Sequence, residues 1–196
     1  MKQVIKQYAL EQGALEIQYI EEFFGEFGRK KTATEIVERL QDREHLIHMI
    51  EAPLPDEPSQ VVPVAFKVGH AIRADETIPK LADLVRRLNG AVTFEGRKVL
   101  YAWIGGTRRD WRGKGFFRAL SEEQEAWAYQ NGFQEIVVKT KNRFYEMRGT
   151  LDNLRFEVVK FEPHPTDNAE SKVYLSRKLD ASVLKSHKLA RTVVRV

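Results

Sequence analysis

A short segment rich in arginine and glycine has the residue types that bind an anion through their backbone. It reads RRDWRGKGFF over residues 108–117, after an apolar run at 99–104 and at the start of a helical pattern. Two glycines one residue apart, Gly113 and Gly115, let the backbone approach a ligand closely. The following helix directs its free first-turn N–H groups and its positive dipole end to the same place. The sequence therefore predicts a phosphate-binding turn made mostly of backbone.

Two better-known glycine loops do not fit this segment. A P-loop ends in Gly-Lys-Ser/Thr, whereas Lys114 is followed by Gly115, and the spacing from Gly106 to Gly113 is too long. A dinucleotide-binding GxGxxG pattern fails because Arg118 stands where its third glycine belongs. The turn therefore belongs to another class of phosphate site.

The segment resembles the pyrophosphate-binding RxxGxG/A signature of the GNAT superfamily, the acyl-coenzyme A dependent N-acyltransferases. The resemblance lies in the run Arg112-Gly113-Lys114-Gly115, and Phe117 stands where the family usually has Gly or Ala. It implies a GNAT-type α/β fold and acetyl-CoA as the co-substrate.

A second resemblance to the family lies further along the chain. Lys139-Thr140-Lys141-Asn142, followed by Leu154-Arg155-Phe156, is similar to the post-strand Asn and the closing Gly-Phe segment of the family. Arg155 takes the place of the glycine. The order of expected elements matches the GNAT fold over residues 4–179.

The resemblance implies roles for individual residues in coenzyme binding. Backbone groups at Gly105 and Thr107 would pair with the pantetheine arm, and Asn142 would hydrogen-bond the coenzyme's arm or thiol side. Backbone N–H groups over residues 112–117 would hold the pyrophosphate. The implied cofactor-binding residues are Gly105, Thr107, Arg112, Gly113, Lys114, Gly115, Phe116, Phe117 and Asn142. Taken without the resemblance, Arg112 and Lys114 would be interpreted as a solvated basic loop.

Candidates for acid and base catalysis are weaker, because the sequence lacks the family's usual tyrosine. Counting back five residues from Phe156 reaches Leu151, and Tyr145, earlier on the same expected helix, is a substitute acid. Glu51 and His70, at the ends of expected strands, are candidate bases that could act through water. The competing interpretation is that all three candidates are ordinary structural polar residues.

The elements that must position these residues follow from hydrophobic periodicity and capping signals. The expected strands cover residues 4–8, 45–50, 61–72, 99–104, 135–140, 156–161 and 172–179. The expected helices cover 14–27, a short stretch opened by the capping box Thr32–Glu35, and 78–89, 116–131 and 142–154. They predict a mixed central sheet of about six to seven strands flanked by helices.

Two packing expectations follow from these helices. In the first helix, the stripe formed by Leu15, Tyr19, Ile20, Phe23, Phe24 and Phe27 is predicted to enter the core. In the helix at 116–131, Glu122, Glu123 and Glu125 are predicted to face water.

The predicted organisation is a single GNAT-like domain over residues 1–179. A helical insertion at 74–93 is expected near the acceptor side as a lid or wall, or else as a surface-packing helix without function. Residues 180–196 form a basic extension, and the stretch 181–196 carries four basic residues and no acid, which accounts for the net charge of +4. Its interleaved apolar residues favour packing on the domain or on a second subunit.

Composition narrows the class of protein. The chain has 196 residues, of which 42% are hydrophobic and 31% charged, as in ordinary globular proteins. It has no cysteine, no apolar run long enough for a membrane span and no metal-ligand spacing, so we expect a cytoplasmic protein without a membrane partner or a metal.

Three functions remain open at this stage. The first is an N-acetyltransferase that passes an acetyl group from acetyl-CoA to a primary amine of a small molecule or a protein, by direct attack in a ternary complex. The second is a non-catalytic acyl-CoA-binding sensor or regulator. The third, nucleic-acid or partner binding through the basic extension, is less favoured, and a homodimer is a further option for the apolar part of that extension.

Overall fold

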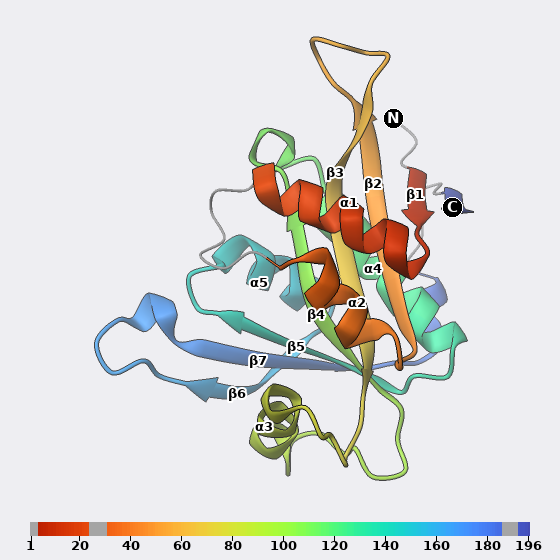
Figure 1. The fold of residues 1–196 in the computed structure, drawn as a ribbon. Coiled ribbons are helices and arrows are strands. Elements are labelled where there is room, and N and C mark those ends of the chain that lie inside the picture. The colour runs from red at the N-terminus through yellow and green to blue at the C-terminus, as the bar shows by residue number, and fades with distance from the viewer. Residues whose placement is uncertain (1–3, 24–30, 186–191) are drawn as a thin grey trace. The chain divides into compact units, whose positions relative to one another are not determined.

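The computed structural model describes residues 4–23, 31–185 and 192–196, which form both helices and strands (Figure 1). The helices are α1 (Leu10–Phe23), α2 (Ala33–Leu40), α3 (Pro79–Leu88), α4 (Phe116–Gln130) and α5 (Tyr145–Asn153). The strands are β1 (Val4–Gln7), β2 (His45–Pro53), β3 (Val61–Ile72), β4 (Val99–Thr107), β5 (Glu135–Lys141), β6 (Glu157–Glu162), β7 (Lys172–Lys178) and β8 (Thr192–Arg195).

The described strands form one mixed sheet with the order β6-β7-β5-β4-β3-β2-β1-β8. The predicted α/β class is confirmed. Strands β4 and β5 pair in parallel, which requires the crossover through α4. The eighth strand, β8, comes from the basic extension and pairs in parallel with β1.

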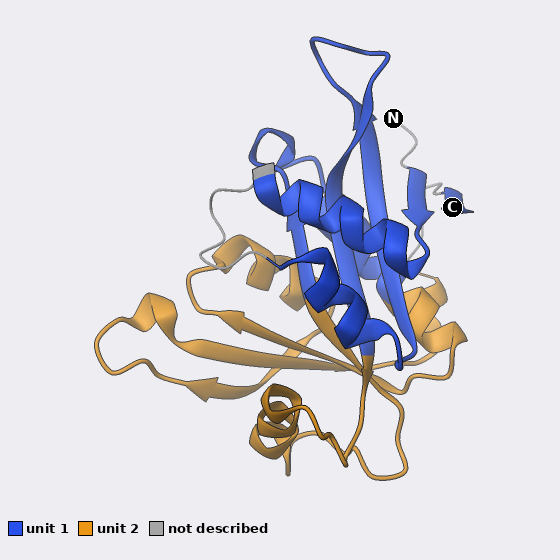
Figure 2. Ribbon diagram, in the orientation of Figure 1, with its two compact units in different colours: residues 1–70, 104–124, 187–196 blue, residues 71–103, 125–186 orange. Residues whose placement is uncertain are grey.

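The chain divides into two compact units (Figure 2). Unit 1 comprises residues 1–70, 104–124 and 187–196, and unit 2 comprises residues 71–103 and 125–186. The single domain expected over residues 1–179 stays a prediction. No described helix is long and apolar enough to cross a membrane.

Unit 1 is built on the antiparallel strands β1, β2 and β3. Helices α1 and α2 lie over one face of β2 and β3 (Figure 1). The start of α4 packs through Ala119 and Leu120 into a cluster of buried apolar residues from the strands. These are Ile5, Ile50, Ala52, Val62, Val64 and Ala65. Burial of this cluster attaches the start of α4 to the sheet.

Helix α1 buries Ile20 as predicted, but the rest of its buried face differs from the predicted stripe. It begins at Leu10, and Leu15 and Tyr19 are 63% and 42% exposed, so their assignment to the core is wrong. The buried residues are Ala14, Ile17 and Ile20. A Cβ at Gly13 would lie 2.8 Å from the side chain of Ile47, so the glycine lets this face approach β2 closely. The predicted core positions Phe24 and Phe27 lie outside the described residues, and Phe23 lies in α1 at their edge.

The predicted capping box of α2 is confirmed. The Thr32 hydroxyl accepts from the N–H of Glu35 (3.1 Å), and the Glu35 carboxylate accepts from the N–H of Thr32 (3.1 Å). Two of the unpaired first-turn donors are thereby satisfied.

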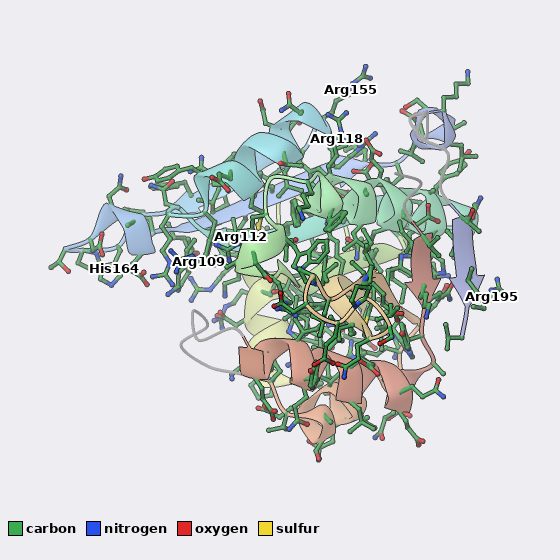
Figure 3. The ribbon with its side chains drawn as sticks, turned by 90° about the horizontal axis from the view of Figure 1, so that it is seen from above. Arg109, Arg112, Arg118, Arg155, His164 and Arg195 are labelled. Atoms are coloured by element: carbon green, nitrogen blue, oxygen red, sulfur yellow. The ribbon has the colours of Figure 1, made fainter. Side chains whose placement is uncertain are left out.

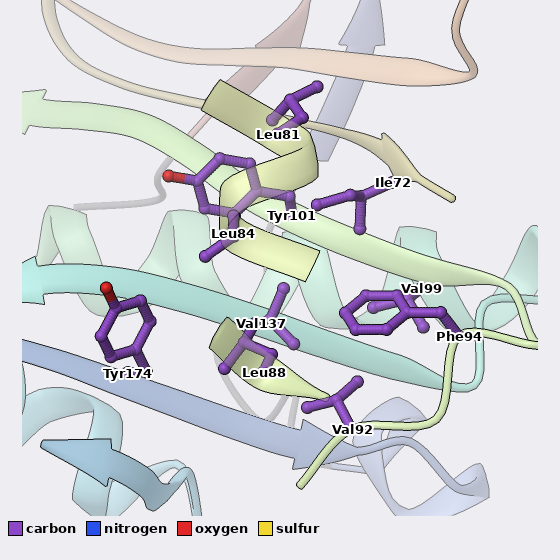
Figure 4. Packing of buried hydrophobic residues seen from close by; sticks show 10 residues of the cluster. All are labelled: Ile72, Leu81, Leu84, Leu88, Val92, Phe94, Val99, Tyr101, Val137 and Tyr174. Carbon is purple, nitrogen blue, oxygen red and sulfur yellow. The ribbon is translucent and has the colours of Figure 1, made fainter. Parts of the chain in front are cut away.

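Unit 2 has its core between α3 and the strands β4, β5 and β7 (Figure 4). Helix α3 buries Leu81, Leu84 and Leu88 among ten clustered residues. The others in this cluster are Ile72, Val92, Phe94, Val99, Tyr101, Val137 and Tyr174. The inserted helix therefore contributes to the core of its unit, and its role as a lid or wall for an acceptor stays a prediction.

Polar contacts fasten α3 to strands of unit 2. Arg87 donates to the Glu162 carboxylate across 2.7 Å, and Lys160 Nζ donates to the Arg87 carbonyl across 2.9 Å. The Tyr174 hydroxyl also donates to Glu162 (3.1 Å), and burial, followed by this hydrogen bond, raises the pKa of Tyr174. That hydroxyl therefore stays protonated and acts as a donor at neutral pH.

The expectation that the glutamates of α4 face water is wrong for two of them. Glu125 is 1% exposed and Glu122 is 4% exposed. Arg177 Nη1 lies 2.6 Å from the Glu125 carboxylate, and Arg118 Nε lies 2.9 Å from that of Glu122. Each buried carboxylate is paired with a cation, buried Arg177 in one case and exposed Arg118 in the other, which the helical pattern alone does not show.

Candidate functional site

The predicted phosphate turn of unit 1 has the backbone that its glycines suggested. After β4 ends at Thr107, a short 3₁₀ turn leads to Gly113 and Gly115, whose φ angles are 77° and 78°. This left-handed region disfavours side chains, so glycine is required at both positions. A Cβ at either position would meet no atom within 4 Å. The glycines thus serve the turn's conformation, and the space beside them is open.

Helix α4 begins immediately after the second glycine. Its first backbone bond runs from the N–H of Ala119 to the carbonyl of Gly115 (3.0 Å). Among the described residues, the preceding N–H groups of Phe116, Phe117 and Arg118 have no backbone acceptor. Three donors and the positive dipole end therefore remain for an anion at the turn.

Cationic side chains, among them Arg109 and Arg112, lie at this turn (Figure 3). Arg112 is exposed and its Nε lies 3.3 Å from the Thr107 carbonyl, so the side chain folds back toward the end of β4. Lys114 Nζ lies 3.9 Å from the centroid of the Trp111 ring. Both exposed cations stay near the turn, where they raise its positive potential.

The two phenylalanines that open α4 have different surroundings. Phe116 stacks on Trp111, with ring centroids 6.1 Å apart, and packs against the apolar cluster of unit 1. Phe117 lies with its ring centroid 4.8 Å from Nζ of Lys67, a lysine of β3 that is 4% exposed. Sequence reasoning missed Lys67. Among residues 61–72 it is the one residue of the Asp, Glu, Lys and Arg types, and this exception in an apolar strand could have identified it.

Gly105 and Thr107 occupy the end of β4 in unit 1. A Cβ on Gly105 would lie 3.1 Å from the Phe66 carbonyl oxygen, so close contact with β3 already requires a glycine there. Beyond Thr107, the N–H of Arg108 donates to the Val64 carbonyl (2.9 Å). The roles of Gly105 and Thr107 toward pantetheine stay predictions.

Asn142 follows β5 in unit 2 and is 8% exposed. Its side-chain nitrogen donates to the Asn168 carbonyl across 3.1 Å, and its side-chain oxygen accepts from Arg148. Its backbone N–H donates to the Ser171 carbonyl (2.8 Å). The side chain thus holds the end of β5 to the segment before β7, and its predicted contact with a coenzyme remains untested.

The candidate acid lies on the surface of unit 2. Tyr145 opens α5 and is 62% exposed. Leu151, at the position of the family's tyrosine, is fully buried in the same helix. A proton donor cannot come from Leu151, and Tyr145 is more than a full turn of helix away.

The candidate bases belong to unit 1. Glu51 follows a bulge in β2, and its carboxylate accepts from Lys6 Nζ (2.6 Å) and from the Tyr8 hydroxyl. These contacts occupy both oxygens of the carboxylate. His70 is fully buried in β3, opposite His45 in the strand register.

A second histidine, His48 of β2, is also fully buried. Neither of its ring nitrogens has a hydrogen-bond partner among the described residues. Burial lowers the pKa of His48 to about 4, so the ring is neutral at pH 7. The described residues contain no cluster of His, Cys, Asp or Glu suited to a metal ion.

No protein family and no curated protein matches this sequence. The fold, in contrast, is similar to several solved acetyltransferases. For NAA60 of Arabidopsis thaliana in complex with a bisubstrate analogue, the TM-score is 0.65 and the identity 11%, over 90% of this chain and 98% of that one.

Two bacterial structures are also similar, with slightly lower TM-scores. A putative acetyltransferase of the GNAT family from Desulfovibrio desulfuricans has a TM-score of 0.61 at 12% identity, over 90% of this chain and 98% of that one. The putative acetyltransferase yncA of Salmonella typhimurium, solved with its cofactor acetyl-CoA, has a TM-score of 0.59 at 12% identity, over 92% of this chain and 96% of that one. The chain therefore has the fold of the GNAT N-acetyltransferases.

Proposed function

We propose that this protein is an N-acetyltransferase that transfers an acetyl group from acetyl-CoA to a primary amine of a small molecule or a protein. The observation that carries the proposal is the turn of residues 112–117. It joins two left-handed glycines to the start of a helix whose first N–H groups have no backbone acceptor among the described residues. Its resemblance to the GNAT signature and the similarity to structures solved with acetyl-CoA support the same ligand.

The residues of the turn fit a pyrophosphate. Backbone N–H groups at the start of α4 supply donors, the dipole supplies a positive potential, and Arg112 and Lys114 supply full charges nearby. The space beside Gly113 and Gly115 is open, so a phosphate oxygen can approach the backbone. Arg112, Gly113, Lys114, Gly115, Phe116 and Phe117 would bind the coenzyme's pyrophosphate.

Bound acetyl-CoA supplies an acetyl thioester that a neutral amine can attack. The chain would contribute mainly orientation, through backbone groups at Gly105 and Thr107 along the pantetheine arm and through Asn142. A backbone N–H at the end of β4 would polarise the thioester carbonyl. Tyr145, Glu51 and His70 remain the candidates for proton transfer.

Calorimetry tests the coenzyme site directly. Acetyl-CoA is titrated into the wild type and into Gly115→Asp, which places a carboxylate and a Cβ in the phosphate turn. Gly132→Asp is the matched control, because Gly132 has a φ of 78°, also has open space around it, and follows the other end of α4. We expect micromolar binding by the wild type and the control, and none by Gly115→Asp.

A thiol-release assay with a panel of amines then tests the transfer. Release of coenzyme A that depends on one class of amine, and that Gly115→Asp abolishes, would establish the activity. A folded wild type that binds no acetyl-CoA would overturn the proposal.

The second candidate function is a non-catalytic acyl-CoA sensor. The surroundings of the acid and base candidates favour it: Leu151 replaces the usual tyrosine, and the carboxylate of Glu51 is engaged by Lys6 and Tyr8. A sensor would bind acetyl-CoA with the same dependence on Gly115 and release no thiol with any amine.

A further inference from the structure

Lys67 is a buried cation beneath the first turn of α4. It lies in β3, is 4% exposed, and donates from Nζ to the Ser121 hydroxyl across 2.6 Å. Its ammonium group also lies 4.8 Å from the centre of the Phe117 ring. Both contacts are to α4, and Phe117 belongs to the turn that the proposed function assigns to pyrophosphate.

The hydrogen bonds around Lys67 run in one direction, toward the helix start. An ammonium group can only donate, so the Ser121 oxygen accepts from Lys67 and its single proton is free to be donated onward. That proton goes to the Phe117 carbonyl, 2.8 Å away. The positive charge thus polarises the peptide group between Phe117 and Arg118.

Polarisation of that peptide reaches the ligand side of the helix. Its N–H belongs to Arg118, one of the first-turn donors without a backbone acceptor among the described residues. A carbonyl that accepts strong hydrogen bonds makes the N–H of the same peptide a stronger donor, and this effect is larger in a buried environment. The charge of Lys67 also adds to the positive potential of the helix end.

Neighbouring residues accommodate the lysine. A Cβ on Gly105 would lie 3.4 Å from Cγ of Lys67, so the glycine leaves room for the aliphatic stem. The aromatic ring of Phe117, where the family usually has Gly or Ala, covers the ammonium group and stabilises it by a cation–π contact. The phenylalanine at position 117, which differs from the usual small residue, therefore packs directly on the buried lysine.

We propose that Lys67 is a positioning residue for phosphate binding, which acts through Ser121 and Phe117 on the N–H groups that begin α4. This inference rests on the proposed coenzyme site. The lysine strengthens binding of the phosphate-bearing end of the coenzyme and does not touch the acetyl group.

The test compares Lys67→Met with the wild type by calorimetry, using coenzyme A and pantetheine as probes. Pantetheine lacks the phosphates, and its weaker binding is measured by competition with coenzyme A. We expect Lys67→Met to weaken coenzyme A binding about tenfold and to leave pantetheine binding within about twofold of the wild type. Methionine fills the stem's volume and removes a buried charge, so the variant should fold, which its circular dichroism checks.

Lys98→Met is the matched control. Lys98 Nζ lies 4.6 Å from the centroid of the Phe133 ring and donates to the Asn131 carbonyl across 2.7 Å. Both partners follow the C-terminus of α4. Its loss removes the same charge and the same kind of ring contact without affecting the helix start, so coenzyme A affinity should stay unchanged. Ser121→Ala, which interrupts the relay but keeps the charge, should weaken coenzyme A binding about threefold, and Lys67→Arg should restore most of the affinity lost in Lys67→Met.

Three outcomes would overturn the inference while the wild type still binds coenzyme A. The first is an unchanged affinity of Lys67→Met for coenzyme A. The second is that Lys67→Met loses affinity for pantetheine and coenzyme A equally. The third is that Lys98→Met loses as much affinity for coenzyme A as Lys67→Met does. The proposed function would stand in each case. A wild type that binds no coenzyme A would overturn both.

Discussion

The backbone N–H of Phe156 donates to the carbonyl oxygen of Leu151 across 2.9 Å, and this bond closes the C-terminus of α5. Between them, Arg155 donates its N–H to the Asp152 carbonyl (2.7 Å) and has a φ of 63°. The two bonds form a Schellman motif, whose left-handed position favours glycine. Arg155 is the one non-glycine residue with positive φ that the described part of the chain contains.

Arg155→Gly should therefore stabilise the protein. The variant keeps both bonds and relieves the left-handed strain, so we expect the free energy of unfolding to rise by about 1 kcal/mol. Urea denaturation of the variant and the wild type measures it. Arg155→Lys, which keeps the Cβ, is the control and should leave stability unchanged, whereas a less stable glycine variant would contradict the prediction.

Arg177→Leu should strongly destabilise the protein. Arg177 is 8% exposed and donates from one nitrogen to the Glu125 carboxylate and to the Leu154 carbonyl. Its removal leaves a buried carboxylate without this cation, which costs about 3–5 kcal/mol. Thermal and urea unfolding measure this loss of unfolding free energy. Arg86→Leu removes the exposed partner of Asp83 as a control, and a loss as large as that of Arg177→Leu would contradict the argument from burial.

His48 should make the protein sensitive to mild acid. Burial lowers the pKa of His48 to about 4, below the value near 6.5 that the unfolded chain has. Above pH 6.5 the ring is neutral in both states and does not affect stability. Between pH 6.5 and 4 only the unfolded chain takes up the proton, so stability falls by about 3 kcal/mol over this window and no further below it.

The check is the free energy of unfolding of wild type and His48→Leu from pH 7 to pH 4. The leucine variant should lack the part of the decline that His48 causes. Parallel curves for wild type and His48→Leu would refute the assignment.

Gly105→Ala should destabilise unit 1. The added Cβ would lie 3.1 Å from the Phe66 carbonyl oxygen, which belongs to a strand and can move little. We expect a loss of about 1–3 kcal/mol in unfolding free energy. In contrast, Gly149→Ala adds a methyl group in α5 where no atom lies within 4 Å, and should gain about 1 kcal/mol. Similar effects of the two substitutions in urea titrations would show that the close contact at Gly105 has no energetic weight.

Local features were well predicted from the sequence. Three such features depend on residues that are neighbours in the chain. They are the capping box at Thr32, the two left-handed glycines of the turn and the full extent of β3. Such features follow from backbone sterics and from hydrogen bonds over a few residues.

Side-chain environments were predicted less well. The stripe of Leu15 and Tyr19 has helical spacing, but the small residue Gly13 brings a different face of α1 onto β2. Glu125 has the spacing of an exposed helix position, and its burial depends on Arg177, which lies 52 residues away in the chain. A periodic pattern therefore misassigns a helix position when a residue far away in the chain pairs with a charged side chain and allows it to be buried.

The sequence was sufficient to determine the class of fold and the glycine turn before α4, since glycine spacing and the following helix act within one short segment. The tertiary structure decided what lies behind that turn. Lys67 comes from β3, whereas Ser121 and Phe117 come from α4, and the Lys67–Ser121 hydrogen bond joins residues 54 apart in the chain. Such a contact depends on how strands and helix pack across the core, and packing is a property of the folded chain rather than of any segment in it.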